Sequence, residues 1–353
     1  MITYHVYKID CSKSSRVMLQ SKWDEKSIFV HLGDNILKTE GLDDISSYKL
    51  SFKKVFNLAL ETNNSEPTKW IFHEQAGLPY LVLFRLINRI RGIYSCTMVY
   101  DMHDLHERVE YKSIFKKIRY DFIRYHLLGL LEKVVFNDRA IKKVIVSDGL
   151  ARIVAKRYKT KNPTVVKSAC NTVYSAQQLA KFNRDSKAII YFGALKHSPL
   201  RLIDYVQEAG LELHFFGRDI NAVSLGNKLG RPLPNCVKYF GEYTPSNLKF
   251  LTGYRYLIMY HPDNVKINYR YSLPNKIFQA ISHGISVIVS NNFEEMIKTF
   301  KNVPGAVKVL HSPNDLKSCT QELENLQSGS YWTEITNLAS RIHDESRQNY
   351  LNL

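Results

Sequence analysis

Several patterns that identify a class of protein at once are missing from this chain of 353 residues. Its five cysteines lie far apart in the sequence: Cys11, Cys96, Cys170, Cys236 and Cys319. This spacing predicts neither a disulfide framework nor a zinc site with closely spaced ligands. No apolar stretch is long enough to cross a bilayer. The first residues alternate like a strand and lack the basic and then apolar layout of a secretion signal, so a cytoplasmic protein is expected.

Acidic residues are too few to balance the basic ones. The formal net charge is +16, and residues 1–172 carry +11 of it, with 29 Lys and Arg against 18 Asp and Glu. Such an excess attracts nucleic acid, an anionic membrane surface or a phosphorylated acceptor. No recognisable nucleic-acid-binding motif accompanies the charge, so no nucleic-acid partner is expected.

Apolar runs rich in β-branched residues alternate with helical patterns along the chain. This alternation predicts an α/β fold with parallel sheets covered by helices, and the length predicts two domains. The predicted strands of the first half are Ile2–Tyr7, Ser27–His31, Lys69–His73, Cys96–Asp101, Lys143–Ser147 and Thr164–Lys167. Those of the second half are Ala188–Phe192, Leu211–Phe216, Cys236–Phe240, Tyr256–Tyr260, Ser286–Ser290 and Ala306–Leu310.

Domain boundaries are suggested by a polar stretch in the middle of the chain. We predict a first domain over residues 1–172, a linker over 173–187 and a second domain over 188–330. Residues 331–353 read as a final helix that has no following strand to cover. We therefore expect this helix to pack back on the first domain.

The densest motif lies in residues 268–295. Ser272 and Pro274 mark a helix start, Gly284 ends that helix, and a buried strand follows. Free amides at a helix start, with the helix dipole behind them, present roughly half a positive charge to an anion, and Lys276 adds a full one. Without further context the same residues also fit an ordinary capped helix that leads into a core strand.

The segment SLPNKIFQAISHGISVIVS resembles the "LPNKxFE…AxGxPVIxS" segment of glycosyltransferase family 4 and its close relatives, many of which assemble bacterial surface polysaccharides. The resemblance implies a GT-B fold, in which two Rossmann-like domains face a cleft and this segment forms the donor-binding helix of the second domain. The implied diphosphate-facing residues are Ser272, Leu273, Pro274 and Asn275. Gln279 takes the place of the acidic residue that holds the ribose, and Tyr271 that of the other glutamate of the family's pair. Neither carries a negative charge.

Three further segments extend the predicted donor site. In IIYFGALKHSP, Gly193 lets the backbone approach a phosphate, and the resemblance places Lys196 on the diphosphate. Lys196 also fits a solvated loop. The segments HFFGR and VKYFGEYTPSNL resemble the family's next two strand ends, which line the nucleotide pocket. Their candidate residues are Gly217, Arg218, Gly241 and Glu242.

In the first domain, CTMVYDMHDLHE ends a predicted strand with crowded titratable groups: Asp101, His103, Asp104, His106 and Glu107. Such crowding is typical of a polar cleft. The spacing is not specific for a metal, and no metal site is predicted. The stretch is similar to the family's "HD" element facing the donor sugar, which assigns that role to His103 with Asp104 beside it. The following Lys112–Lys133 reads as a basic amphipathic helix, either simply solvated or docked on anionic lipid.

Together these features predict an enzyme that moves a sugar from a UDP- or GDP-linked donor to a hydroxyl of a glycan acceptor, which we expect to be lipid-linked. No cofactor is expected. Lys196, Lys276 and the helix start would neutralise the departing diphosphate without a metal, since no Asp-x-Asp pair lies at a strand end. The resemblance implies retention of the anomeric configuration, whereas inversion would need a carboxylate base such as Asp104 or Asp101.

Two alternatives stay open at this stage. One is a catalytically silent glycosyltransferase-like subunit, favoured by Tyr271 and Gln279, and the other is a sugar-nucleotide epimerase of the same architecture. Peripheral attachment to the inner face of the cell membrane would bring the protein to a lipid-linked acceptor.

Overall fold

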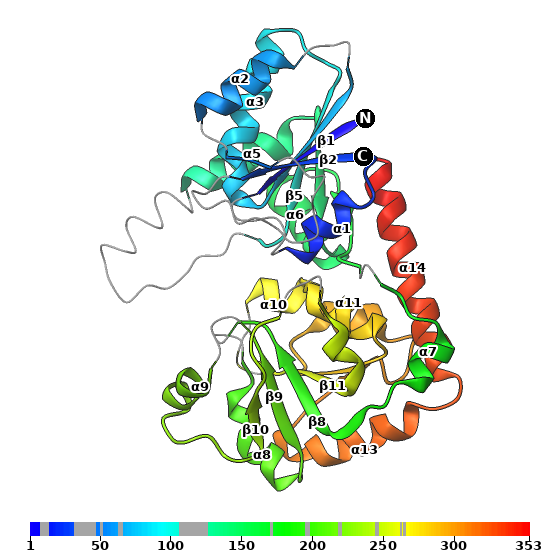
Figure 1. Cartoon of the computed structure of the whole chain (residues 1–353). Helices are drawn as coiled ribbons and strands as arrows, with labels where there is room; N and C mark the ends of the chain where they lie inside the picture. Colours follow the sequence, from blue (N-terminus) through cyan, green and yellow to red (C-terminus); the bar gives the residue numbers. More distant parts are fainter. Residues whose placement is uncertain are drawn as a thin grey trace. The chain divides into compact units, whose positions relative to one another are not determined.

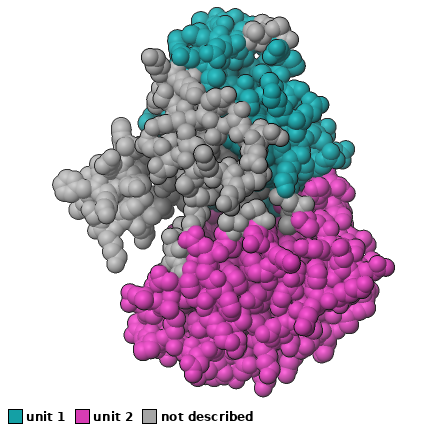
Figure 2. Space-filling view, in the orientation of Figure 1, with its two compact units in different colours: residues 1–168, 345–353 teal, residues 169–344 magenta. Residues whose placement is uncertain are grey.

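The structure is a computed structural model that describes residues 1–7, 14–31, 47–49, 52–62, 66–105, 126–169, 172–194, 198–217, 221–243, 247–261, 263 and 266–353. The chain divides into two compact units, coloured separately in Figure 2. Unit 1 contains Met1–Ser168 and Glu345–Leu353, and unit 2 contains Ala169–Asp344. Within the described ranges, no helix has both the length and the apolar character needed to traverse a bilayer.

In the described part of unit 1, seven strands form one sheet in the order β3-β2-β1-β4-β5-β6-β7, with every neighbouring pair parallel. The strands are β1 (Ile2–Tyr7), β2 (Lys26–His31), β3 (Ser47–Lys49), β4 (Thr68–His73), β5 (Cys96–Met102), β6 (Ile141–Ile145) and β7 (Thr164–Val165). The helices are α1 (Ser15–Ser21), α2 (Phe52–Glu61), α3 (Leu78–Ile90), α5 (Leu128–Asn137) and α6 (Asp148–Tyr158), with a 3-10 turn η2 (Gln75–Gly77) before α3 (Figure 1).

Unit 2 has the same plan. Its described strands form a parallel sheet in the order β10-β9-β8-β11-β12-β13. The strands are β8 (Asp185–Phe192), β9 (Glu212–Phe216), β10 (Val237–Tyr239), β11 (Tyr254–Met259), β12 (Ser286–Val289) and β13 (Val307–Val309). The helices are α7 (Ala176–Lys181), α8 (Ile203–Glu208), α9 (Ala222–Leu229), α10 (Ile267–Tyr271), α11 (Asn275–Ser282), α12 (Glu294–Phe300), α13 (Leu316–Leu326) and α14 (Tyr331–Leu351). Short 3-10 turns are η5 (Leu200–Leu202), η6 (Lys249–Gly253) and η7 (Pro313–Asp315).

The central strands read as continuous apolar runs because helices cover both faces of each sheet. In β8, consecutive residues Ile189 and Ile190 point to opposite faces, and both are fully buried. The core on one face joins Ile189 and Leu213 of the sheet to Val206 of α8 and Leu323 of α13. The predicted α/β class with parallel sheets is therefore confirmed.

Each predicted strand is present, with ends that differ by a few residues. Strand β3 was not predicted, because its three residues, Ser-Tyr-Lys, carry no apolar run. The predicted linker over residues 173–187 is not an open linker. It contains α7, whose start is fixed by a capping box between Ser175 and Gln178, and the first residues of β8. This capping box was not predicted.

The last helix, α14, ends in unit 1. Its residues from Glu345 onward belong to that unit, where Tyr350 is fully buried. The Tyr350 hydroxyl donates a hydrogen bond to Asp24 Oδ2 at 2.7 Å. The buried ammonium of Lys69 donates to the Tyr350 carbonyl at 3.2 Å. These contacts tie the end of the chain to β4 and to the loop before β2.

Each sheet has one point where the strand order reverses direction. In unit 1 this switch lies between β1 and β4, and in unit 2 between β8 and β11. In open α/β sheets, ligands bind outside the carboxyl ends of the strands at such a point. We therefore expect a ligand site at the switch point of each unit.

Candidate sites at the two switch points

A lysine stands at the switch point of unit 2. Lys276 is the second residue of α11, and its Nζ lies 4.6 Å from the centre of the Tyr191 ring in β8. Gly193 follows directly after β8 with a φ of +142°. A Cβ added to Gly193 would lie only 2.8 Å from Lys276 Nζ, so the glycine leaves the space that the ammonium occupies. The structure thus brings Gly193 and Lys276, two predicted site residues, into contact.

The charge of Lys276 has no counterion in the described residues. Burial lowers the pKa of its ammonium to about 8, and no carboxylate offsets that effect. A cation that is desolvated and unpaired favours the arrival of an anion. The backbone amides at the start of α11 also favour an anion. Pro274 is the N-cap, and its side chain makes no capping hydrogen bond to these amides. This corner of unit 2 therefore suits a phosphate group.

The remaining predicted residues of the LPNK segment fall into two groups. Tyr271, Ser272 and Asn275 are partly exposed beside the start of α11. Leu273 and Gln279 are buried, with 1% and 5% of their surfaces exposed. Burial leaves the side-chain amide of Gln279 little surface for a ligand. The backbone carbonyl of Gln279 accepts a hydrogen bond from His283 Nδ1 at 2.7 Å.

A pocket of about 600 Å³ opens beside the ends of β9 and β10. Its aromatic wall contains Phe216 and Phe250, whose rings stack with centres 4.4 Å apart. Its polar lining includes Glu242, Asn247 and Lys249. The predicted residues Gly217 and Gly241 are the chain neighbours of the lining residues Phe216 and Glu242, and the Gly217 amide donates a hydrogen bond of 2.9 Å to the Gly241 carbonyl. Lys196 and Arg218, predicted to contact the donor, lie outside the described residues.

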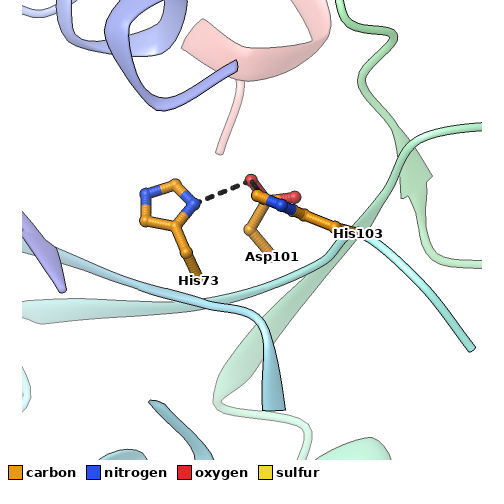
Figure 3. Close-up of side chains that lie close together, drawn as sticks. All are labelled: His73, Asp101 and His103. Atoms are coloured by element: carbon orange, nitrogen blue, oxygen red, sulfur yellow. Dashed lines mark hydrogen bonds and ion pairs between the residues drawn. The ribbon is translucent and has the colours of Figure 1, made fainter. Parts of the chain in front are cut away.

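In unit 1 the carboxyl edge of the sheet carries a buried charge cluster, shown in Figure 3. Asp101 lies in β5 with 1% of its side chain exposed, and His73 Nδ1 at the end of β4 lies 3.0 Å from its Oδ2. Arg16 of α1 donates to both carboxylate oxygens, at 2.7 Å from Nη2 and 3.0 Å from Nε. Burial opposes the ionised form of Asp101, but Arg16 and His103 outweigh it and hold its pKa well below the usual range. Asp101 is thus an ionised anchor and is too enclosed to serve as a base.

The predicted His103 is the outer member of this cluster. Its Nε2 lies 3.4 Å from Asp101 Oδ2, and its Nδ1 lies 3.4 Å from Glu74 Oε1. Burial alone would lower the pKa of His103, but the Asp101 and Glu74 carboxylates outweigh it and raise the pKa to about 9. His103 is therefore an imidazolium at neutral pH. Its neighbour Asp104 is exposed, and His106 and Glu107 lie outside the described residues.

A row of four side chains continues inward from Asp101. His73 Nε2 lies 3.1 Å from His5 Nδ1, and His5 Nε2 lies 2.9 Å from Asp24 Oδ2. Each of these contacts is short enough for a hydrogen bond, so the two imidazoles link the Asp24 and Asp101 carboxylates. Burial lowers the pKa of His73 to about 4.

His73, Asp101 and His103 are also a set of residue types that binds metals, with ligand atoms within 4.8 Å of one another. Their present partners are better explained without an ion. Arg16 already occupies both oxygens of Asp101, and a second cation beside that guanidinium would be repelled. The contacts with Arg16 and His73 hold the Asp101 carboxylate beside His103, 3.4 Å from its Nε2.

Glu74 is held in a strained backbone conformation. Its φ is 59° and its ψ is 176°, a region in which residues other than glycine pay on the order of 1–3 kcal/mol. Among the described residues, Lys159 is the other non-glycine residue with positive φ. The Glu74 carboxylate accepts a hydrogen bond from the Tyr7 hydroxyl at 3.1 Å. Tyr7, Glu74 and His103 therefore converge from the ends of β1, β4 and β5 at the switch point, and 22% of the Glu74 side chain is exposed.

The sequence singled out His103 as a candidate but not the groups that surround it in the structure. Arg16, His5 and Asp24 come from segments 70 or more residues away from β5, and no local pattern marks them. His73 and Glu74 could have been found, because they directly follow the apolar part of a predicted buried strand.

The sequence matches no protein-family model, and no curated protein matches it. Solved structures do resemble the fold. HepE of Anabaena, crystallised with UDP and glucose, aligns over 100% of both chains with a TM-score of 0.65 at 11% identity. A glycosyltransferase of Rickettsia africae aligns over 99% of this chain and 93% of its own with a TM-score of 0.59 at 12% identity. WaaG, a glycosyltransferase of lipopolysaccharide biosynthesis, aligns over 98% and 95% with a TM-score of 0.55 at 13% identity.

Proposed function

From the premise that this chain has the GT-B fold, we propose that it transfers a sugar from a nucleoside diphosphate to a hydroxyl of a glycan acceptor. The observation that carries the proposal is Lys276, a partly buried cation without a counterion in the described residues, at the switch point of unit 2. HepE, which shares the fold, was crystallised with UDP-glucose as well as with UDP and glucose.

The donor diphosphate would bind between Lys276 and the start of α11, with Gly193 allowing close approach. There the fixed positive charge would stabilise the leaving nucleoside diphosphate without a metal ion. We propose Lys196 and Arg218 as further contacts to the donor, because their segments resemble the family's donor site. The pocket lined by Phe216 and Phe250 has room for the base, which would lie against Phe216 and bond to polar groups such as Glu242.

The acceptor hydroxyl would bind to unit 1 at Glu74 and His103. The bond from the anomeric carbon to the phosphate oxygen breaks as the bond to the acceptor oxygen forms. In the retaining route, the leaving phosphate oxygen takes the acceptor's proton, and the charge of His103 helps to orient the reacting sugar. An inverting route would need Glu74 or the exposed Asp104 as the base, since Asp101 is held by Arg16.

We further propose that the acceptor is lipid-linked, that the protein works at the cytoplasmic face of a membrane, and that the product belongs to a surface polysaccharide. The excess of basic residues in residues 1–172 supports a contact with anionic lipid. The predicted basic helix Lys112–Lys133 lies outside the described residues as far as residue 125.

The test is a screen of UDP- and GDP-linked sugars for release of the nucleoside diphosphate, with membrane lipid extract as the acceptor source. We expect release that depends on the extract and on Lys276. Binding of a sugar nucleotide without turnover would favour the silent subunit, which the uncharged Tyr271 and the buried Gln279 also favour. Conversion of the donor to an isomer without any acceptor would favour an epimerase. Failure of every sugar nucleotide to bind would contradict the proposal.

A further inference from the structure

Three neighbouring helices of unit 1 leave apolar side chains in solvent. They are Phe56 and Leu60 on α2, Leu86 and Ile90 on α3, and Leu130 and Val134 on α5, each between 44% and 77% exposed. In every helix the two residues are four positions apart, so they form a stripe along one face. We call these six residues the apolar stripes.

The three helices that carry the stripes are neighbours. Figure 1 shows α2, α3 and α5 together on one side of the unit 1 sheet. The end of α3 is tied to the end of α2, because Arg91 Nη1 donates to the carbonyls of Ala59 and Thr62 at 2.5 and 3.1 Å. Arg85 of α3 pairs at 2.8 Å with Asp138, directly after α5. These bonds hold α3 between its two neighbours.

Exposed apolar side chains are concentrated on this surface. The described residues include thirteen large apolar side chains that are exposed, and eight of these thirteen lie on or beside α2, α3 and α5. The eight are the six residues of the apolar stripes together with Tyr94 after α3 and Leu127 before α5. Contiguous exposed apolar surface on a soluble domain marks a binding site for another apolar surface. Isolated residues of this kind would need no explanation.

The charged residues around the apolar stripes indicate what kind of surface they bind. The exposed charged residues on α3, α5 and their ends are basic, namely Arg89, Arg91, Lys133 and Arg139, and the exposed acidic residue at the end of α2 is Glu61. A second copy of the chain in a two-fold dimer would place this positive surface against itself, which costs repulsion. Apolar side chains mixed with Arg and Lys match the boundary between lipid headgroups and acyl chains.

We propose that the apolar stripes of α2, α3 and α5 dock on an anionic membrane, with the aliphatic side chains inserted and the neighbouring arginines among the headgroups. The inference gives the membrane contact of the proposed function a definite surface, and it can fail while the donor site stands. It also differs from the predicted helix Lys112–Lys133, because most of the proposed contact comes from α2 and α3.

The experiment compares Ile90→Glu with Val223→Glu. Ile90 is 77% exposed on α3 of unit 1, and Val223 is 70% exposed on α9 of unit 2, so the two variants make nearly the same change on different surfaces. Binding is measured by co-sedimentation with vesicles of equimolar phosphatidylglycerol and phosphatidylcholine, and with phosphatidylcholine alone. UDP binding and thermal unfolding of the same preparations serve as controls for the donor site and the fold.

We expect the wild-type protein to bind the anionic vesicles and to bind phosphatidylcholine much less. Ile90→Glu should lower partitioning by about tenfold or more, because it removes an inserted side chain and adds a charge that anionic lipid repels, whereas Val223→Glu should not change it. The inference is overturned if the wild type ignores anionic vesicles, or if the two variants bind equally. It is also overturned if sedimentation velocity shows a wild-type dimer that Ile90→Glu dissociates.

Discussion

Replacing Lys276 with alanine should weaken binding of a nucleoside diphosphate while leaving the empty protein at least as stable as before. The ammonium is partly buried, touches the Tyr191 ring and lacks a counterion in the described residues. The positive charge of Lys276 therefore destabilises the folded protein when no nucleotide is bound. A bound diphosphate would offset this destabilisation and form a charge-assisted hydrogen bond with the ammonium.

The size of the effect follows from two estimates. A hydrogen bond to a charged group contributes about 1.5–3 kcal/mol. Independently, burial lowers the pKa of Lys276 from 10.5 to about 8, which corresponds to a cost on the order of 3 kcal/mol for the charged form. Losing an interaction of this size should raise the dissociation constant by about 10- to 150-fold.

Isothermal titration calorimetry with UDP or GDP, whichever binds the wild type more tightly, measures this change. Lys317→Ala is the matched control, since it removes the same charge from an exposed site on α13 of the same unit. Equal affinities for Lys276→Ala and wild type would refute the phosphate role of Lys276. If nucleotide-free Lys276→Ala melts well below the nucleotide-free wild type, the charge of Lys276 does not destabilise the empty protein and this reasoning is refuted.

Three further outcomes are expected. The affinity for the same nucleotide should fall as the pH rises through about 8, where Lys276 loses its proton, and a pH-independent affinity in titrations would contradict this. Arg16→Met should lower the free energy of unfolding by about 3–5 kcal/mol, since it removes the guanidinium that bonds both oxygens of the buried Asp101 carboxylate, whereas Arg85→Met at a more exposed pair should lose about 1 kcal/mol or less in urea titrations. Glu74→Gly should relieve the strained backbone and raise the melting temperature while transfer activity falls; a lower melting temperature, or unchanged transfer, would show that Glu74 is not held in place for binding.

The strands of both sheets were predictable because parallel strands covered on both faces need uninterrupted apolar runs. Strand β8 and strand β12 show this clearly, with residues such as Ile190 and Ile288 fully buried. The elements that escaped prediction owe their place to other causes. Strand β3 is short and polar, and α7 is set by a cap between Ser175 and Gln178.

The sites were predictable in part. Gly193 and Lys276 were each found from local motifs, yet only the structure brings the glycine beside the lysine ammonium. His103 was predicted from a crowded strand end that resembles the family's HD element. The protonation state of His103 depends on Asp101 and Glu74, and the orientation of Asp101 depends on Arg16. Such pairings come from tertiary contacts between distant segments, which the spacing of residues in one sequence does not encode.

The donor site is tested most directly by a crystal structure of the protein with the nucleoside diphosphate that it binds. We expect electron density for the two phosphates between Lys276 Nζ and the first amides of α11, with the base in the pocket beside Phe216. A nucleotide bound elsewhere, with Lys276 still facing only Tyr191, would contradict the donor site proposed for unit 2.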